Sequence, residues 1–291
     1  MRLGFTTLGI PPDEIVGLAV WAEQCGWNGV WYGEHLLQPA SISSKYPYAP
    51  KAPLAHKPDY GDPLVVLGAI AAATTTISVG TAIYVLPLRH PLMAVRAATT
   101  VQTVSHGRLL LGLGYGWMRE EFDAVDIPYE ERGPRFDEAL EILRRASGGG
   151  PFSFEGRHYR FGEVTITERN VAIPVVVAGK GEKTFARAAR WGDAWYSAPA
   201  MTVAECEHAR ERIEALRAAA GTTARPFHYI VRYPGLDPSG LDRYLEAGFD
   251  DIVLAGVDIF PRSVVGTLTV DDMKQRLTDV AQDFGLQPVA G

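Results

Sequence analysis

Short apolar runs rich in β-branched residues alternate along this chain with longer segments in which apolar positions recur every three or four residues. The short runs predict buried strands, and the longer segments predict amphipathic helices. The predicted strands are residues 3–8, 29–33, 77–86, 108–114, 174–179, 193–197, 227–233 and 250–256. The predicted helices are residues 13–25, 62–75, 91–104, 131–147, 183–191, 203–220, 239–247 and 270–284.

This alternation favours an α/β fold, a (β/α)8 TIM barrel in which residues 1–291 form a single domain. A closed barrel leaves no strand edge exposed and places its binding loops at the C-terminal ends of the strands. An open doubly wound sheet is the alternative arrangement of the same elements.

Two segments interrupt the alternation. Residues 35–61, rich in Pro, Ser, Tyr and Lys, are too long for a compact connection after the second strand. They predict a lid or binding loop, with a passive surface loop as the alternative. Before the fifth strand, FSFEGRHYRFGEVTI alternates aromatic and polar residues around a glycine, which predicts a small hairpin at the barrel rim.

Composition excludes several functions. The hydrophobic fraction of 47% and the charged fraction of 21% are those of a globular protein, and a net charge of −6 gives no overall basic field for nucleic acid or an anionic membrane. Cys25 and Cys206 are too few for a disulfide framework and lack metal-site spacing. Without an apolar signal segment or a run of eighteen apolar residues, we expect a soluble cytoplasmic protein.

The second predicted strand ends in GVWYGEH, which places Glu34 and His35 at the binding face of a barrel. An imidazole titrates near neutral pH, so His35 is suited to move a proton or to bind a reacting group. The alternative is a structural histidine. Neither HExxH nor paired Cys/His spacing occurs, and therefore we expect no metal.

The fourth predicted strand runs into GLGYGWMREEF, residues 112–122. In this segment Gly112, Gly114 and Gly116 alternate with larger residues. Glycines on one face allow a flat ligand or a neighbouring backbone to approach closely. Trp117 then either stacks on a ring system or caps the barrel. Glu120 and Glu121 either bind a cofactor or favour a helix N-terminus.

Two more segments suggest ligand binding. The third predicted strand has a centre of small residues, Gly80, Thr81 and Ala82, which indicates either tight packing or a bulge that admits a ligand. After the fifth strand, AGKGEKT (residues 178–184) combines glycines and Lys180 ahead of a helix. Free amide groups there predict a phosphate-binding turn, with an ordinary Gly-rich turn as the alternative.

Taken together, GVWYGEH, YPY, DPLVVLGAIAAATTTISVGTAI, LRHPLMAVRAATTVQTVSHGRLLLGLGYGWMREEFDAVDIPYEERG and VAGKGEKTFARAARWGDAWY resemble the luciferase-like monooxygenase and F420-dependent oxidoreductase family. The resemblance covers about residues 1–200 and continues to GFDDIVLAG near the end. It implies a barrel whose C-terminal mouth holds FMN or the deazaflavin coenzyme F420. The GxGxGW and EERG segments most resemble the F420-dependent branch.

The resemblance also implies roles for residues. Ala82 and Ile83 match a bulge with a non-prolyl cis peptide bond that supports the flavin or deazaflavin ring, and His35 matches a histidine near the ring's reactive face. Residues 178–181 match the segment that binds the cofactor phosphate. Trp117 stands where sugar-phosphate dehydrogenases of the family have a glutamate, so their sugar substrate is not implied.

The candidate catalytic residues are His35, Glu34 and Trp117. The candidate cofactor-binding residues are Ala82, Ile83, Gly114, Tyr115, Gly116, Glu120, Ala178, Gly179, Lys180 and Gly181. The candidate partners for the anionic oligoglutamate tail of F420 are Lys45, Lys51, Lys57, Arg89 and Lys183, which otherwise form only a solvated rim.

The first hypothesis is hydride transfer between F420 and a small organic substrate, with His35 orienting the substrate or relaying a proton and residues 41–61 excluding water. The second is an FMN-dependent monooxygenase supplied by a separate flavin reductase. The third is a non-catalytic flavin-binding barrel. Because members of the family often dimerise, we also expect a homodimer.

Overall fold

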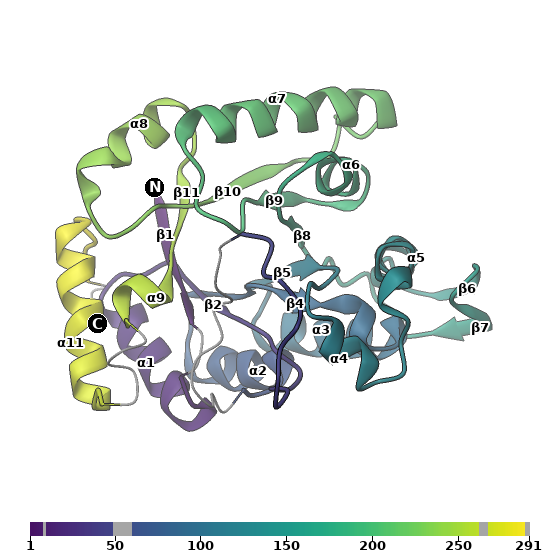
Figure 1. Ribbon diagram of the computed structural model, residues 1–291, viewed down its shortest axis with the longest axis horizontal. Helices are drawn as coiled ribbons and strands as arrows, with labels where there is room; N and C mark the ends of the chain where they lie inside the picture. The colour runs from purple at the N-terminus through teal and green to yellow at the C-terminus, as the bar shows by residue number, and fades with distance from the viewer. Residues whose placement is uncertain (8–9, 49–59, 262–266, 289–291) are drawn as a thin grey trace.

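The computed structural model describes residues 1–7, 10–48, 60–261 and 267–288 (Figure 1). The strands are β1 (Arg2–Thr7), β2 (Gly29–Tyr32), β3 (Ser78–Thr81), β4 (Tyr84–Val85), β5 (Leu109–Gly114), β6 (Pro151–Glu155), β7 (Arg160–Thr165), β8 (Val175–Ala178), β9 (Ala194–Tyr196), β10 (His228–Arg232) and β11 (Asp251–Leu254). The helices are α1 (Pro12–Gln24), α2 (Pro63–Ala73), α3 (Pro91–Val104), α4 (Arg119–Asp123), α5 (Arg132–Ser147), α6 (Glu182–Trp191), α7 (Val203–Ala220), α8 (Leu241–Glu246), α9 (Gly256–Ile259) and α11 (Val270–Asp283).

The strands form a closed parallel barrel. Their order is β3-β2-β1-β11-β10-β9-β8-β5, and pairing of Val79 on β3 with Leu109 on β5 closes the ring. The short strand β4 pairs with β5 further along, through Tyr84 and Val85. Helices surround the strands in Figure 1. This arrangement confirms the predicted (β/α)8 barrel and excludes the open doubly wound sheet.

The packing between strands and helices follows from the sequence. The strands carry apolar residues on both faces because one face lines the barrel interior and the other contacts the helices. Asp62 caps α2 by accepting a hydrogen bond from the Leu64 amide at 2.9 Å. Gly26 and Gly248 follow α1 and α8 with φ of 89° and 81°, a left-handed conformation that favours glycine.

The third predicted strand, residues 77–86, is interrupted. It forms β3 and β4, and the peptide bond between Ala82 and Ile83 that separates them is cis. A Cβ atom on Gly80 would lie 2.5 Å from the Trp31 ring. Tight packing therefore accounts for Gly80, and the cis bond at Ala82 interrupts the strand. That the interruption admits a ligand stays a prediction.

The predicted hairpin is also confirmed. Strands β6 and β7 pair in antiparallel fashion and project beside α5 in Figure 1. Glu138 of α5 holds the turn by accepting hydrogen bonds from the backbone amides of Arg157, His158 and Tyr159. The Glu138 carboxylate thus helps to fasten the hairpin to α5, together with a hydrogen bond from Arg145 to the Ser153 carbonyl oxygen.

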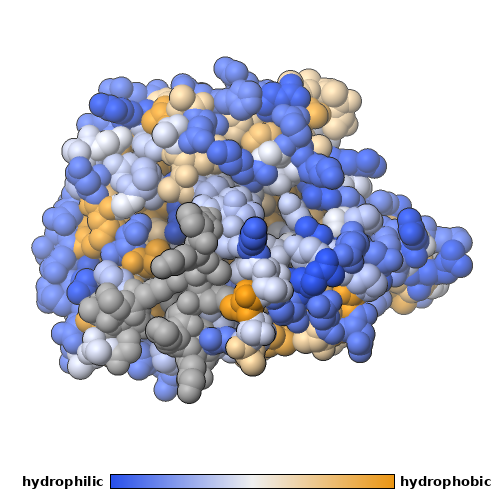
Figure 2. Space-filling view, viewed as in Figure 1, coloured by the Kyte–Doolittle hydropathy of each residue, from blue (hydrophilic) through white to orange (hydrophobic). Residues whose placement is uncertain are grey.

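The described surface is consistent with the composition. Hydrophilic residues cover most of the face shown in Figure 2, and hydrophobic residues occur there in separate small groups. Among the helices of the described ranges, none combines the length and the apolar composition needed to cross a bilayer. Within the same ranges, no group of three or more His, Cys, Asp or Glu side chains could hold a metal ion.

Candidate functional site

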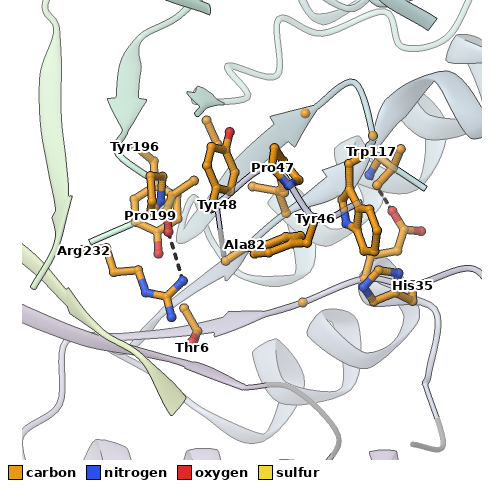
Figure 3. A pocket seen from close by; sticks show the side chains of 18 of the residues that line it. Thr6, His35, Tyr46, Pro47, Tyr48, Ala82, Trp117, Tyr196, Pro199 and Arg232 are labelled. Atoms are coloured by element: carbon orange, nitrogen blue, oxygen red, sulfur yellow. Dashed lines mark hydrogen bonds between the residues drawn. The ribbon is translucent and has the colours of Figure 1, made fainter. Parts of the chain in front are cut away.

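A cavity of about 670 Å³ opens at the C-terminal ends of the barrel strands (Figure 3). Its size is within the range that holds a cofactor or a drug-sized ligand. The lining residues from β1 and β2 and the segments after them are Thr6, Thr7, Gly33, Glu34 and His35, with Lys45–Tyr48 from the long loop. The β3–β5 side contributes Ala82, Ile83, Val85, Gly114, Tyr115, Gly116 and Trp117. The β8–β11 side contributes Ala178, Tyr196, Ala198–Ala200, Arg232, Pro234, Gly235, Val257 and Asp258.

The structure brings most of the predicted site residues to this cavity. Those that line it are His35, Glu34, Trp117, Ala82, Ile83, Gly114, Tyr115, Gly116 and Ala178. Those that do not are Glu120, Gly179, Lys180 and Gly181. Of the predicted tail partners, Lys51 and Lys57 lie outside the described residues, and Lys183 is exposed away from the cavity.

His35 forms a pair with Glu121, the second residue after the α4 N-terminus. The His35 Nδ1 atom lies 3.2 Å from Oε1 of Glu121, which also accepts a 2.7 Å hydrogen bond from the Leu36 amide. An ionised carboxylate only accepts hydrogen bonds, so a hydrogen bond to an ionised Glu121 requires the tautomer with the proton on Nδ1. Nε2 has no hydrogen-bond partner among the described residues and is left for a ligand. The Trp117 ring packs edge-on against the imidazole at 5.9 Å.

Glu34 is held differently. Its side chain is 1% exposed, and it forms an ion pair with the Arg89 guanidinium while Oε2 accepts a 2.5 Å hydrogen bond from the Val85 amide. Burial raises the pKa of Glu34, against the opposing effect of Arg89. The Arg89 guanidinium also lies 4.1 Å from the centre of the Tyr84 ring. Glu34 and Arg89 therefore tie the end of β2 to β4, and Arg89 is occupied by a partner within the protein.

Three glycines shape the wall between β3 and β5. A Cβ on Gly112 would lie 1.9 Å from the Thr81 carbonyl oxygen, and one on Gly114 would lie 2.5 Å from the Ile83 side chain. Gly116, at φ 80°, would meet Val85 and Phe122 at 2.7 Å. Of the two explanations that the sequence left open, close approach of protein atoms accounts for these glycines, and the resulting wall still faces the cavity at Gly114 and Gly116.

Glu120 fastens the long loop to α4. It accepts hydrogen bonds from the backbone and side chain of Ser43, at 2.6 and 2.8 Å, and from those of Ser44, at 3.1 and 2.7 Å. Desolvation opposes ionisation, but the hydrogen bonds from Ser44 and Ser43 lower the pKa of Glu120 to about 2. This anchor holds residues 45–48 over the cavity, with the Tyr46 ring 5.2 Å from that of Trp117.

The predicted phosphate-binding turn, Ala178–Gly181, contacts the same loop. A Cβ on Gly179 would lie 3.1 Å from the Tyr48 hydroxyl, and that hydroxyl also receives a hydrogen bond from the Lys180 backbone. Burial raises the pKa of Tyr48 to about 12, so the phenol stays neutral at pH 7. The Lys180 ammonium group lies 2.8 Å from Glu205 on α7. The Tyr48 hydroxyl thus accepts a hydrogen bond from the Lys180 amide, which belongs to the turn predicted to bind a phosphate.

Several cavity residues were not predicted from the sequence, and two of them are arginines. Arg232 is the last residue of β10, and Arg132 is the first residue of α5, where it packs 3.7 Å from the centre of the Tyr129 ring. The sequence could have indicated Arg232, because it is a charged residue near the C-terminal end of a predicted barrel strand. His35 was predicted by a similar argument, since it directly follows such a strand. Arg132 lies in the EERG segment that resembles the F420-dependent branch, but no role was predicted for it, and the fold carries it to the cavity at the start of a helix.

A closed parallel barrel whose strand ends surround such a cavity defines the class of TIM-barrel enzymes. Within this class, the model of the luciferase-like monooxygenase family matches residues 3–234. The chain therefore belongs to the luciferase-like monooxygenase family, and this membership supports an oxidoreductase.

Proteins similar to this chain include a monooxygenase and F420-dependent enzymes. The monooxygenase RslO1 from Streptomyces bottropensis has a similar structure, with a TM-score of 0.69 and 20% identity over 97% of this chain and 98% of that one. An F420-dependent secondary alcohol dehydrogenase in complex with an F420–acetone adduct has a TM-score of 0.64 and 17% identity over 97% of this chain and 89% of that one. The F420-dependent glucose-6-phosphate dehydrogenase of Beutenbergia cavernae is 30% identical over 200 residues, 66% of this chain and 55% of that protein.

Proposed function

We propose that this protein is an F420-dependent oxidoreductase that transfers a hydride between the deazaflavin coenzyme and a small organic substrate. The observation that carries the proposal is a pair of cationic side chains in the cavity lining, which also contains the carboxylates of Glu34, Glu121 and Asp258. Lys45 and Arg132 line the cavity, and neither of them has a carboxylate within 4.0 Å among the described residues. Cationic groups without a carboxylate partner in a protein of net charge −6 favour a polyanionic ligand. F420, with its phosphate and oligoglutamate tail, is such a ligand, and the F420-dependent relatives support this choice.

The shape of the cavity fits the coenzyme ring. Ala82 and Ile83 form a bulge on one wall, and Gly114 beside them leaves that wall without a projecting side chain. When bound, F420 supplies the carbon that gives or accepts the hydride. The protein's contribution is then to hold the ring and substrate at the right separation and to exclude water.

His35 is the residue best placed to handle a proton. Glu121 fixes the proton on Nδ1 and orients the ring, which leaves Nε2 to donate to or accept from a substrate oxygen. Trp117 packs against the imidazole and limits its rotation. The 45–48 segment covers the cavity and reduces the access of water.

For the coenzyme phosphate, the turn at residues 178–181 remains our proposed site. In this structure the Lys180 amide donates to the Tyr48 hydroxyl, and the Gly179 amide donates to the Tyr196 carbonyl oxygen at 3.0 Å. Phosphate binding at the Lys180 amide therefore requires Tyr48 to move away. A phosphate accepts more hydrogen bonds than a phenol, and each such bond to an ionised group is stronger. We therefore expect the loop around Tyr48 to change position when the coenzyme binds.

Equilibrium binding of F420 and of FMN, followed by fluorescence quenching, tests the proposal. We expect F420 to bind at micromolar concentration or below, and FMN to bind at least tenfold more weakly. Binding of FMN alone would contradict the proposal and favour an FMN-dependent monooxygenase that needs a reductase. Tight binding of F420 without turnover of any alcohol, ketone or activated alkene would instead favour a non-catalytic barrel.

We also propose a homodimer that buries the outer face of α2 and α3. Helix α2, PLVVLGAIAAA, has no charged residue, although the side chain of Val65 on it is 72% exposed. Met93 on the neighbouring α3 is 70% exposed. A helix that is apolar on all sides is usually covered on all sides.

Light scattering coupled to gel filtration tests the homodimer. It should give twice the chain mass of 31.7 kDa for the wild type, and a smaller mass for Val65→Glu. A monomeric wild type at micromolar concentration would contradict the proposal.

A further inference from the structure

Arg210 and Arg276 each make a single side-chain hydrogen bond, and neither lines the cavity. Arg232 also uses few of its hydrogen-bond donors, but it does line the cavity. Its side chain makes one hydrogen bond, from Nη1 to the Ala198 carbonyl oxygen at 3.0 Å. Arg89 and Arg187 are paired with Glu34 and Asp137. Arg108 lacks a carboxylate too, but it donates to carbonyl and hydroxyl oxygens of the α2 and α3 ends with all three of its nitrogens, and its role is structural. Arg232 keeps most of its donors free, and they face the cavity.

The barrel order places Arg232 across the cavity from the proposed ring-binding wall. In the ring β3-β2-β1-β11-β10-β9-β8-β5, β10 lies four strands from β3 in either direction. A flat ring that packs against Ala82 and Ile83 therefore turns its free face toward the end of β10. In Figure 3, Arg232 and His35 lie at opposite ends of the pocket with Ala82 between them.

Two hydroxyl groups accompany the guanidinium. Tyr196 is 2% exposed, and its hydroxyl has no hydrogen-bond partner among the described residues. Burial raises its pKa to about 12, in spite of the neighbouring Arg232, so the phenol remains a donor. Thr6 accepts a 2.9 Å hydrogen bond from the Gly256 amide, which leaves its own proton free to donate. Asp258 also lines the cavity, but it lies more than 4.0 Å from the guanidinium nitrogens.

From these contacts we propose that Arg232, with the hydroxyls of Tyr196 and Thr6, binds an oxyanion of the substrate. The substrates are then small organic acids that carry a carboxylate. This inference rests on the proposed function, because the position of the coenzyme ring decides which face of it Arg232 meets. A planar guanidinium matches a carboxylate through two parallel hydrogen bonds, and the anion lies beside the free face of the ring. The carboxylate would orient the substrate so that its reacting carbon lies between Arg232 and His35.

The coenzyme phosphate is the other source of the same chemistry, and a titration separates the two. Protein saturated with F420 is titrated at constant ionic strength with sodium benzoate, and in parallel with benzamide, which has nearly the same shape without the charge. Binding is followed by ligand-observed NMR. The variants are Arg232→Gln and Arg232→Lys, with Arg212→Gln as control, since Arg212 is on the surface and pairs with Glu182.

We expect wild-type protein to bind benzoate at least tenfold more tightly than benzamide. Arg232→Gln should lose at least tenfold in benzoate affinity, while its affinities for benzamide and F420 stay within threefold of wild type. Arg232→Lys should lie between the two, because it keeps the charge but not the planar pair of donors. Arg212→Gln should behave as wild type.

Other results would overturn the inference. Equal benzoate affinity in wild type and Arg232→Gln, or no benzoate binding by wild type at 50 mM, would exclude a carboxylate site at Arg232. A tenfold loss of F420 affinity in Arg232→Gln, with inorganic phosphate competing against F420, would assign the arginine to the coenzyme phosphate. If wild type does not bind F420 at all, the proposed function fails on its own. The benzoate comparison in coenzyme-free protein then still decides whether Arg232 binds an oxyanion.

Discussion

The two ends of the barrel differ in the pairing of their arginines and in how fully side chains fill the interior. At the N-terminal end, Arg2 on β1 pairs with Asp251 on β11 at 2.6 Å, and Trp31 fills the interior against Gly80. At the C-terminal end, Arg232 and Arg132 have no carboxylate partner among the described residues, and a cavity of about 670 Å³ is left open. The cavity at the N-terminal end is small, about 10 Å³, whereas the large cavity lies where we propose that the barrel binds a ligand.

Replacing His35 should give the largest effect, a decrease in the rate of the reaction with little change in coenzyme affinity. With F420 bound, His35→Ala should slow coenzyme reduction or oxidation by about 10²- to 10⁴-fold, the usual contribution of a proton-transferring group. F420 affinity should stay within about tenfold. Stopped-flow absorbance with any substrate that the wild type turns over measures the rate. An unchanged rate would remove His35 from the mechanism and leave the mouth as a binding site only.

Replacing the neighbouring Glu34 should act on stability instead. Glu34→Ala leaves the Arg89 guanidinium, 15% exposed, without its carboxylate. Loss of one partner of a largely buried pair costs about 3–5 kcal/mol in unfolding free energy. Denaturant titration checks this value, with Glu34→Gln as the milder variant that keeps an acceptor for Val85. A change below about 1 kcal/mol would mean that this part of the mouth is less tightly held than the contacts indicate.

At the opposite end of the barrel, pH should reveal the cost of a buried carboxylate. Burial raises the pKa of Asp251 to about 6, against the opposing charge of Arg2. Because the folded pKa is above the unfolded one, the stability that the protonated form provides is complete below about pH 4 and is lost as pH rises through about 6. Asp251→Asn should therefore gain about 1–2 kcal/mol at pH 8 and flatten the pH dependence between 4 and 7. A loss of stability at pH 8 would show that the pair with Arg2 outweighs the burial.

The smallest expected effect comes from replacing Glu120, which fastens the long loop to α4. Glu120→Gln removes the charge that receives the hydrogen bonds of Ser43 and Ser44, and should loosen the segment that carries Tyr48. We expect about threefold faster proteolytic cleavage within the loop and unchanged global stability. Since hydrogen bonds lower the pKa of Glu120 to about 2, the wild-type loop should loosen in the same way only as pH falls below about 4.5 toward 2. Equal cleavage of both proteins would mean that other contacts hold the loop.

The sequence predicted the barrel and the hairpin because periodicity reports which faces are buried. The position of His35 at the mouth was also predictable, because a residue that follows a barrel strand lies at the C-terminal end of the barrel. By the same rule, Arg232 at the end of β10 could have been predicted to line the cavity, although it was not. The contact of Tyr48 with Lys180 could not be predicted, because it joins a loop and a turn that are more than a hundred residues apart. Glu120 was assigned to the cofactor, whereas its hydrogen bonds go to two serines of the loop.

A crystal structure of the protein with F420 would test the central claim most directly. Our account predicts the deazaflavin ring against Ala82 and Ile83, with its free face toward Arg232, its phosphate at residues 178–181 and Tyr48 displaced from Lys180. A coenzyme bound elsewhere, or a ring face covered by Tyr46 with Tyr48 still in place, would contradict it.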